Sequence, residues 1–493
     1  MKRSLLLLGA ALLLTACAQD SGPAKESPRA GLTASQRTRP NIIVIMADDL
    51  GYSDVSTYPG GRLPTPNIDR LGREGVIFTQ GYVTAPICSP SRAGLMTGRY
   101  QQRFGFEYNN GPDFRDAADH LGLAPSEITL AQVMQGGGYH TGAIGKWHLG
   151  WNDEHYPTRR GFDEWWGFLS GQSNYMDPHD PAAINVVPPP GPGQPMTSIA
   201  QPYDKPSRFT AIITGPDRKV VDVGDRYLTE EITAQAIGFI DRNKDRPFFL
   251  HLAYNAPHTP LQTTRKYYDR FPNITNERDR VYAAMVSALD DGVGAVLDHL
   301  DQAGLGENTI VVFMSDNGCA AYIPGLCSAE TLSGGKLTLL EGGVRVPFMM
   351  RWPRRIRPHT VHQAPISSLD VFPTVVAAAG LKPPPRPYDG KDLMVQLSDK
   401  AVWSRNPLYW RSTPIRAVRD GDWKYLETYD GERFLYDVKA DPRETVNLAS
   451  REPKRVAAMK AKLDSWETDK VPPAWKPRFV EFDFGGRHFK YQP

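Results

Sequence analysis

Asn41-Ile-Ile-Val-Ile-Met-Ala47 is a continuous apolar run of strand length, and Asp48 and Asp49 follow it directly. A run of β-branched residues without alternation is typical of a strand that is covered on both faces. Similar runs recur at Phe248 to Tyr254, Thr309 to Met314 and Val346 to Met350. Helical stretches lie between them, at Thr229 to Arg242 and Val281 to Leu300. Strands that alternate with helices predict an α/β core, with a large, mostly parallel sheet sandwiched by helices.

The rest of the chain predicts a smaller second unit after this core. A proline-rich hinge, Pro383-Pro384-Pro385-Arg386-Pro387, is followed by strand-like pieces at Ile415 to Arg419, Trp423 to Leu426 and Arg433 to Tyr436. A helix is expected from about Arg451 to Glu467. We therefore expect a catalytic domain over residues 39–382 and a small C-terminal α+β subdomain, with an antiparallel sheet, over residues 383–493. Proline crowds residues 177–207, which we expect to form a long surface loop near the site or an insertion.

The N-terminus has the pattern of an export signal. Lys2 and Arg3 precede an apolar run, Leu5 to Leu14, which is too short to span a bilayer, so residues 1–17 are interpreted as a signal peptide. The run ends in Leu14-Thr15-Ala16-Cys17, which resembles a bacterial lipobox. We expect acylated Cys17 and a flexible tether over 18–38, giving a periplasmic or outer-membrane lipoprotein. Ordinary cleavage after Ala16 is the alternative, and both alternatives predict export.

Charge and cysteine content limit the remaining choices. The net charge is +2, with 57 basic and 55 acidic residues, so there is no bulk electrostatic case for nucleic acid or an anionic membrane surface. Cys319 and Cys327 either form a local disulfide or remain free thiols. Cys88 is then left without a partner, which is a liability in an exported protein unless the residue is used chemically.

Acidic side chains follow two of the predicted buried strands. Asp48 and Asp49 follow the first, and Asp316 and Asn317 follow the run that ends at Met314. Ligands of open α/β sheets bind beyond the carboxyl ends of strands, so these side chains could converge. Adjacent carboxylates repel unless a cation neutralises them, and an oxygen-rich set suits calcium or magnesium better than zinc. The alternative is that each pair only forms a turn or a cap.

A short motif around Cys88 carries the most specific signal. Cys88-Ser-Pro-Ser-Arg92 lies at the start of a predicted helix, Ser91 to Met96, where free N–H groups favour an anion. Cys88-Ser-Pro-Ser-Arg-Ala-Gly-Leu-Met-Thr-Gly-Arg99 resembles the signature of type I sulfatases of the alkaline phosphatase superfamily. In that family a separate maturation enzyme converts the cysteine into formylglycine (3-oxoalanine), and the recognised Cys, Pro and Arg are present here as Cys88, Pro90 and Arg92.

The resemblance extends over most of the chain after the tether. The matching blocks are Asn41 to Asp49, Lys146-Trp-His-Leu-Gly150, Asn255-Ala-Pro-His258, Ser315-Asp-Asn-Gly318, Lys336 with Glu341-Gly-Gly-Val-Arg-Val-Pro347, and Leu435-Tyr-Asp437 with Asp441-Pro442. The overall likeness is to arylsulfatase and N-acetylgalactosamine-6-sulfatase relatives, which implies an alkaline-phosphatase-like sulfatase core. It also implies one calcium ion beside residue 88, with Asp48, Asp49, Asp316 and Asn317 as its ligands.

The resemblance also implies roles for the basic residues. Lys146 and Lys336 would bind the sulfate, and either His258 or Lys336 would protonate the leaving group. His148 would be the base that collapses the covalent intermediate, and Arg92 would hold the hydrated aldehyde in orientation. One hydroxyl of that hydrate attacks sulfur, and deprotonation of the other expels sulfate, with the metal as Lewis acid and template.

These residues predict a calcium-dependent hydrolase of carbohydrate sulfate esters. The alternative is a phosphate or phosphonate monoester hydrolase of the same superfamily, although the extra ligands for paired zinc are not found at convincing spacing. We interpret His251 as a packed core histidine. An aromatic group, Phe162, Trp165, Trp166 and Phe168, forms either a sugar-stacking platform or core. Glu341-Gly-Gly with Arg345 is interpreted as a turn that positions Lys336.

Overall fold

The computed structural model describes most of the chain after the predicted tether. It covers residues 39–110, 120–186, 202, 207, 210–323, 325–327, 331–398, 407–412, 415–429, 431–476, 481–484 and 487–490. The predicted signal peptide, Cys17 and the tether fall before residue 39 and lie outside the described residues. Among the helices in these ranges, none combines the length and the apolar character needed to cross a membrane.

A ten-stranded sheet forms the centre of the molecule, in the order β14-β2-β13-β11-β1-β9-β4-β5-β7-β8. Five neighbouring strands at its centre are parallel: β11 (Thr309–Ser315), β1 (Asn41–Ala47), β9 (Phe248–Ala253), β4 (His140–Lys146) and β5 (Glu164–Phe168). The flanks are β13 (Phe348–Arg351), β2 (Val76–Phe78) and β14 (Thr360–His362) on one side, and β7 (Ile213–Thr214) and β8 (Lys219–Val220) on the other. Antiparallel pairs occur only towards these flanks of the described sheet.

One predicted strand is divided into two, and proline is the reason. The run Val346 to Met350 is divided into β12 (Arg345–Val346), which pairs with β3 (Gly81–Tyr82), and β13, which joins the large sheet. Pro347 lies between them and has no N–H to donate to a ladder, so the chain changes sheets there. Strand β15 (Ile366–Ser367) completes the small sheet around β3.

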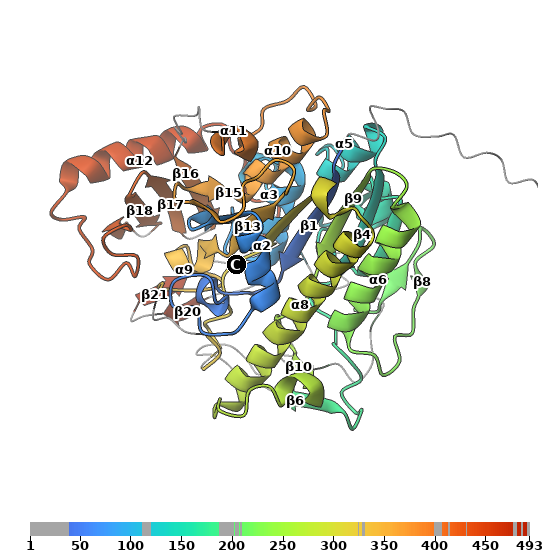
Figure 1. The fold of residues 1–493 in the computed structure, drawn as a ribbon. Coiled ribbons are helices and arrows are strands. Elements are labelled where there is room, and N and C mark those ends of the chain that lie inside the picture. The colour runs from blue at the N-terminus through green and yellow to red at the C-terminus, as the bar shows by residue number, and fades with distance from the viewer. Residues whose placement is uncertain are drawn as a thin grey trace, which may run out of the picture.

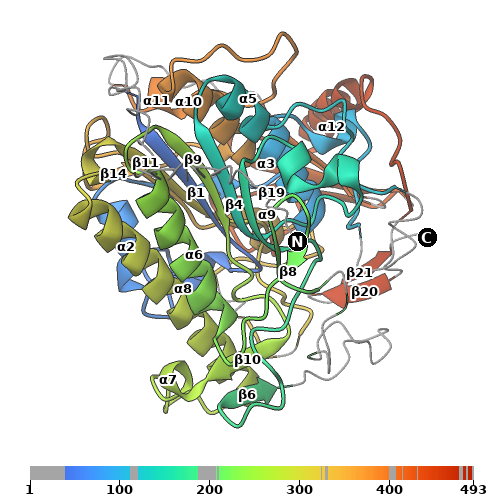
Figure 2. The same cartoon turned by 90° about the vertical axis from the view of Figure 1, so that its right-hand side faces the viewer.

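Helices cover both faces of the large sheet, as predicted (Figures 1 and 2). Ile42 and Val44 of β1 face the core that contains α3 (Cys88–Thr97), α5 (Leu130–Gly136) and α10 (Val371–Ala378). Ile43 and Ile45 face the core under α2 (Pro66–Arg73), α6 (Leu228–Asn243) and α8 (Glu277–Gln302). Successive residues of a strand point to opposite faces, so an all-apolar strand is what a two-sided core requires.

The C-terminal subdomain is an antiparallel sheet placed between a helix and the main core. It contains β16 (Leu408–Ser412), β17 (Ile415–Asp420), β18 (Trp423–Thr428) and β19 (Arg433–Asp437), with α12 (Pro453–Glu467) outside (Figure 1). Val418, Tyr425 and Leu435 pack against α12. Their neighbours Ala417 and Leu426 belong to the core of the large domain. The subdomain is therefore joined to the catalytic domain through a continuous apolar layer.

The predicted loop 177–207 contains a short strand in its described part. Strand β6 (Ala183–Val186) pairs with β10 (Leu261–Thr264), and residues 187–201 and 203–206 lie outside the described residues. The remaining helices and strands are α7 (Arg265–Tyr268), α9 (Glu341–Val344), α11 (Leu393–Gln396), β20 (Glu481–Phe484) and β21 (Arg487–Lys490). Short 3-10 turns span Tyr52–Asp54, Gln101–Arg103, Asp153–His155, Pro157–Arg159, Gly306–Asn308 and Ser368–Asp370.

Candidate functional site

The predicted site residues meet at the carboxyl ends of the central parallel strands. Asp48 and Asp49 follow β1, Asp316 and Asn317 follow β11, and Lys146 ends β4. The register of β1 and β11 places Ala47 beside Ser315, so the two acidic pairs leave the sheet side by side. All of the predicted residues are buried, with at most 6% of their surface exposed: Asp48, Asp49, Cys88, Arg92, Lys146, His148, His258, Asp316, Asn317 and Lys336.

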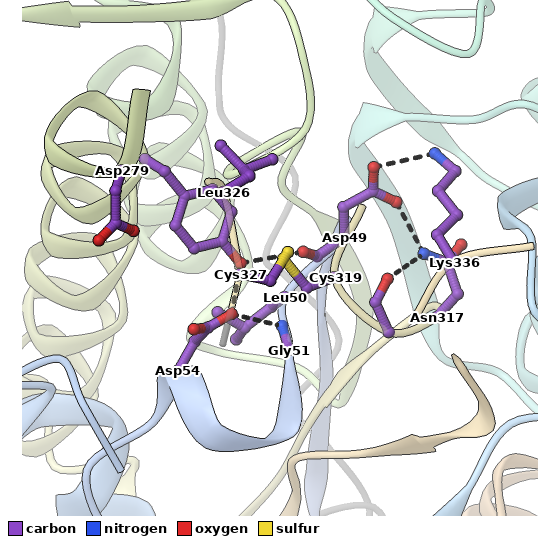
Figure 3. Close-up of a disulfide and its surroundings, with 12 residues drawn as sticks. Asp49, Leu50, Gly51, Asp54, Asp279, Asn317, Cys319, Leu326, Cys327 and Lys336 are labelled. Carbon is purple, nitrogen blue, oxygen red and sulfur yellow. Dashed lines mark hydrogen bonds and ion pairs between the residues drawn. A yellow bond between two sulfur atoms is a disulfide. The ribbon is translucent and has the colours of Figure 1, made fainter. Parts of the chain in front are cut away.

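The carboxylate of Asp49 is shared by several partners (Figure 3). Asn317 Nδ2 donates to its Oδ1 at 2.7 Å, and Lys336 Nζ donates to its Oδ2 at 2.9 Å. His258 Nε2 lies 3.6 Å from the same Oδ2. Asp49 thus joins the ends of β1 and β11 to the loops that carry Lys336 and His258.

A second set of contacts surrounds Asp48 and Asp316. Lys146 Nζ donates to Asp48 Oδ2 at 2.5 Å, and Cys88 Sγ lies 3.5 Å from Asp48 Oδ1. Arg92 donates from Nε and Nη2 to Asp316 Oδ2, at 2.9 and 2.8 Å, and from Nη1 to the Lys146 carbonyl at 2.9 Å. Arg92 therefore fixes α3 against β11 and β4, and its predicted hold on a hydrated aldehyde stays a prediction.

Cys88 is the first residue of α3, three residues before the predicted start of the helix. The free N–H groups and the positive end of the helix dipole lie at this end, where they favour an anion. Burial nevertheless raises the pKa of the Cys88 thiol, and the opposing charges of Lys146 and Lys336 do not offset it. An unmodified Cys88 is therefore a neutral thiol rather than a thiolate nucleophile.

The two site histidines are neutral in this environment. Burial lowers the pKa of His148 well below its ordinary value, and the charges of Lys146 and Arg92 lower it further. Burial also lowers the pKa of His258, with Lys336 as the next cause. Both ring nitrogens of His148 are buried without a hydrogen-bond partner among the described residues. His258 Nδ1 lies 2.7 Å from the Thr259 carbonyl, so it carries the proton and donates there.

Three non-glycine residues of this region have left-handed backbones. They are Asp49 (φ 64°), His148 (φ 57°) and Leu337 (φ 76°), which directly follows Lys336. Such conformations cost about 1–3 kcal/mol each and persist where the surroundings determine them, which is common at active sites. The backbone is therefore held in place at three of the segments that carry site residues.

The oxygen atoms of Asp48, Asp49 and Asn317 fit a hard divalent cation, and residue 88 would add an oxygen in place of its sulfur once it is formylglycine. Ligand atoms of Asp48, Asp49, Cys88 and His258 all lie within 4.8 Å of one another. Asn317 Oδ1 is a buried carbonyl oxygen with no hydrogen-bond partner among the described residues, as expected of a cation ligand. His258 was not predicted in this group. Asp316 was predicted as a ligand; its Oδ2 accepts from Arg92, and its part in binding a cation stays a prediction.

With a divalent cation bound, the charges of the site would suit an anionic substrate. Burial and the negative charge of Asp48 raise the pKa of Asp316, which shows that the carboxylates repel one another. Three Asp carboxylates are balanced by the cations of Arg92, Lys146 and Lys336. A divalent cation would leave a net positive site, which is the sign that an anionic substrate requires.

The disulfide alternative is confirmed, and the bond lies beside the site. Cys319 and Cys327 are bonded, with 6.3 Å between their Cα atoms (Figure 3). The Cys319 carbonyl accepts a hydrogen bond from the Lys336 N–H at 2.8 Å. Tyr322 lies within this disulfide loop, and burial raises its pKa to about 12 while the charge of Lys336 opposes the rise.

Sequence reasoning missed two tyrosines that support the site. Tyr175 donates to the carbonyls of Asn255 and His258, at 2.6 and 2.8 Å. Tyr282, on α8, donates to the Asp49 carbonyl at 3.1 Å and to Asp54 Oδ2 at 2.6 Å. A buried tyrosine that donates a hydrogen bond has the same sequence pattern as any other buried tyrosine, so no signal in the sequence identifies this role.

Two weaker interpretations are resolved in favour of the core. Phe162, Trp165, Trp166 and Phe168 are buried, with at most 6% of their surface exposed, so the sugar-stacking alternative is wrong for them. His251 is buried within β9, as predicted, and burial lowers its pKa to about 3.

Comparisons with known proteins agree with this geometry. The family model described as Sulfatase matches residues 40–381, and a model described as N-sulphoglucosamine sulphohydrolase, C-terminal, matches residues 335–469. N-acetylgalactosamine-6-sulfatase of Mus musculus is 34% identical over 84% of this chain and 78% of its own length. Steryl-sulfatase of Mus musculus is 33% identical, covering 84% and 73%.

Solved structures show the same fold. Ps i-CgsB in complex with k-i-k-neocarrahexaose has a TM-score of 0.77 and 33% identity, covering 89% of this chain and 94% of that one. The phosphonate monoester hydrolase of Agrobacterium radiobacter, at 20% identity and a TM-score of 0.62, shares the fold alone. Family model, relatives and fold therefore agree: this chain belongs to the sulfatase family and is a sulfuric ester hydrolase.

Proposed function

We propose that this protein removes sulfate from carbohydrate sulfate esters, using residue 88 in its formylglycine form and one calcium ion. The observation that carries the proposal is the position of Cys88 at the first turn of α3, buried and grouped with Asp48, Asp49 and His258. A relative named for N-acetylgalactosamine-6-sulfate and a similar structure in complex with a neocarrahexaose support a carbohydrate substrate.

The neutral thiol of Cys88 supports modification by a maturation enzyme. A buried thiol with a raised pKa is a poor nucleophile, whereas a hydrated aldehyde at the same position offers two hydroxyl groups. The calcium ion, held by Asp48, Asp49, Asn317 and residue 88, would supply Lewis-acid polarisation of a sulfate oxygen. Asp316 would complete this group, as the family resemblance implies.

The surrounding cations and histidines then have separate tasks. Lys146 and Lys336 bind the sulfate oxygens, because both ammonium groups are fixed at the site by carboxylates. The charge of Asp49 raises the pKa of Lys336 against the effect of burial, so this side chain stays protonated. His148 accepts a proton from residue 88, because its ring is neutral and both nitrogens are without a described partner.

His258 has a more restricted part. Its Nδ1–H is donated to the Thr259 carbonyl, so Nε2 is the atom that faces Asp49 and the substrate side of the site. His258 Nε2 can donate to the leaving oxygen only when the ring is protonated, whereas Lys336 already carries its proton. Either residue completes the proposed proton transfer to the leaving group.

The decisive experiment combines mass spectrometry with a substrate panel. The protein is produced with a formylglycine-generating enzyme, and the mass of the peptide that contains residue 88 is measured. Turnover is then measured on defined sulfated oligosaccharides and on the sulfate, phosphate and phosphonate esters of 4-nitrophenol. We expect formylglycine at residue 88 and turnover of at least one sugar sulfate. Unmodified cysteine in an active preparation, or faster turnover of the phosphonate than of every sulfate, would refute the proposal.

A further inference from the structure

The loop that carries Lys336 is a closed ring of backbone that contacts the rest of the active site. Its base is closed by the Gly342 N–H, which donates to the Ser333 carbonyl at 2.7 Å. Lys336 N–H donates to the Cys319 carbonyl and Leu337 N–H to the Pro86 carbonyl, both at 2.8 Å. The Lys336 loop, residues 333–343, thus contacts the segment after β11 and the segment before Cys88.

The interior of this loop has no spare space. A Cβ at Gly343 would lie 2.0 Å from the Thr338 carbonyl oxygen and 2.5 Å from that of Gly335. A Cβ at Gly342 would lie 2.6 Å from the Ser333 carbonyl oxygen. Closely packed backbone moves as a unit, so a displacement at the base of the loop reaches Lys336.

The base of the loop is attached to the C-terminal subdomain by buried charges. Glu341 Oε1 lies 3.0 Å from Lys424 Nζ on β18, and Lys424 Nζ lies 3.1 Å from Glu444 Oε1. The Glu341 N–H donates to Glu444 Oε2 at 2.6 Å. All three side chains are fully buried. Ser333 also donates from its hydroxyl to the Arg443 carbonyl.

Stability alone does not account for these three charges. Removing charged groups from water costs free energy, whereas burying apolar side chains is favourable, so a buried ion network is weak evidence for stabilisation. The apolar layer of Ala417, Leu426 and Tyr436 already joins the subdomain to the catalytic core. The network adds a defined orientation, because its ion pairs and hydrogen bonds fix how the Lys336 loop lies on the subdomain.

We propose that the C-terminal subdomain positions Lys336 in the active site through the Glu341–Lys424–Glu444 network. Lys424 and Glu444 are positioning residues that act through Glu341 and the base of the loop. The inference rests on the proposed role of Lys336 at the sulfate and the leaving oxygen. It assigns to the C-terminal subdomain a part in the reaction, although the subdomain supplies none of the predicted site residues.

The test compares two charge-removing substitutions in neighbouring strands. Lys424→Met keeps an unbranched side chain, one atom shorter, and removes its charge from the network. Arg416→Met is the matched control, because Arg416 on β17 pairs with Glu427, Asp464 and Glu467, all within the subdomain. The formylglycine content at residue 88 is measured by mass spectrometry in each variant, so that a loss of maturation is separated from a loss of positioning.

Leaving-group dependence distinguishes positioning from general damage. A displaced Lys336 gives less help to a poor leaving group, so Lys424→Met should lower kcat about tenfold on a sugar sulfate and less on 4-nitrophenyl sulfate. Arg416→Met should leave both rates unchanged. No loss on either substrate, or an equal loss in Arg416→Met, would overturn the proposal.

A double-mutant cycle with Lys336→Met tests whether Lys424 acts through Lys336. We expect Lys424→Met to have little further effect on kcat once Lys336 is removed, whereas additive losses would show that it acts elsewhere. If Lys424→Met does not fold, Glu341→Gln replaces it in the same cycle.

Hydrogen exchange keeps the test independent of the substrate. Amides of 331–345 should exchange faster in Lys424→Met than in Arg416→Met, even if no sugar sulfate is turned over. Unchanged exchange in these amides would refute the positioning role and leave the proposed function untouched.

Discussion

At residue 88, burial of the thiol and its position at the start of a helix have opposite effects on the pKa of the thiol. The helix end and two lysines favour a thiolate, and burial favours the neutral thiol and prevails. Among the described residues, the hydrogen-bond contact of Cys88 Sγ is a 3.5 Å approach to Asp48 Oδ1, so a structural contact does not explain a cysteine in this position. A chemical role therefore accounts for the cysteine at position 88 better than packing does.

The first prediction concerns this side chain. Cys88→Ala should abolish sulfatase turnover, because no hydroxyl can be formed at residue 88, and should lower the free energy of unfolding by only about 1 kcal/mol. Turnover of 4-nitrophenyl sulfate and urea unfolding of the same preparation measure the two effects. Retained turnover would contradict the formylglycine mechanism. An unfolded variant would contradict the expected small loss of stability.

The second prediction concerns the cation and Asn317. Calcium should stabilise the protein by about 2.7 kcal/mol when its concentration is a hundred times its Kd, because it binds the folded site and not the unfolded chain. Thermal unfolding after chelation and after return of calcium measures this difference. Asn317→Ala removes an Oδ1 that has no hydrogen-bond partner in the described part of the chain, and should weaken the stabilisation. Zinc and magnesium serve as controls, and equal stabilisation of both proteins by calcium would exclude Asn317 as a ligand.

Among the elements, the long buried strands and helices could be predicted closely from the sequence. Strands β1, β9 and β11 and helices α6 and α8 agree with the predicted runs within a few residues, because apolar periodicity is a strong signal over such lengths. Short elements were missed where tertiary contacts decide them. Strand β16 was not predicted, and α3 begins at Cys88 rather than Ser91.

The third prediction concerns the disulfide loop. The double variant Cys319→Ser with Cys327→Ser should lose about 2–3 kcal/mol of stability, because the bond limits the freedom of the unfolded chain. It should also lose sulfatase activity, since the Cys319 carbonyl holds the Lys336 N–H at 2.8 Å. Denaturant unfolding and kcat/KM are compared in preparations with equal formylglycine content. Full activity in the less stable variant would show that the loop stabilises the fold without holding Lys336.

The fourth prediction concerns pH and the junction between β18 and the Lys336 loop. Burial raises the pKa of Glu444 from 4.5 to about 7, and the charge of Lys424 opposes this while that of Glu341 adds to it. A raised carboxyl pKa contributes stability that is complete below pH 4.5 and is lost as the pH rises through about 7. The groups that face this junction are Glu341, Lys424, Arg345, Arg419 and Tyr82.

Glu444→Gln is the variant that isolates this effect. Gln keeps the shape and stays neutral, so the variant should not share the loss of up to about 3 kcal/mol that the shift implies for the wild type. Thermal unfolding from pH 5 to pH 8 measures both proteins in the same buffers. Parallel curves would show that Glu444 does not titrate in this range.

At the scale of the whole molecule, the sequence predicted which residues meet at the edge of the sheet better than it predicted the contacts that hold them. The acidic pairs after β1 and β11 and the motif at Cys88 are local patterns, and the fold brings them together at one edge of the sheet. The Glu341–Lys424–Glu444 network joins residues far apart in the chain, and each residue alone has the pattern of an ordinary surface charge. Only the packing of the subdomain on the core shows that these three residues form a buried network.

The fifth prediction concerns the tether to the membrane, which we propose from the lipobox pattern at Cys17. In a bacterial host, the wild-type protein should incorporate labelled palmitate and sediment with membranes, and Cys17→Ala should do neither. Sulfatase turnover of the released variant should equal that of the wild type, because the predicted site residues all lie between Asp48 and Lys336. Palmitate label retained in Cys17→Ala would place the lipid elsewhere, and a wild-type protein without label would favour ordinary cleavage after Ala16.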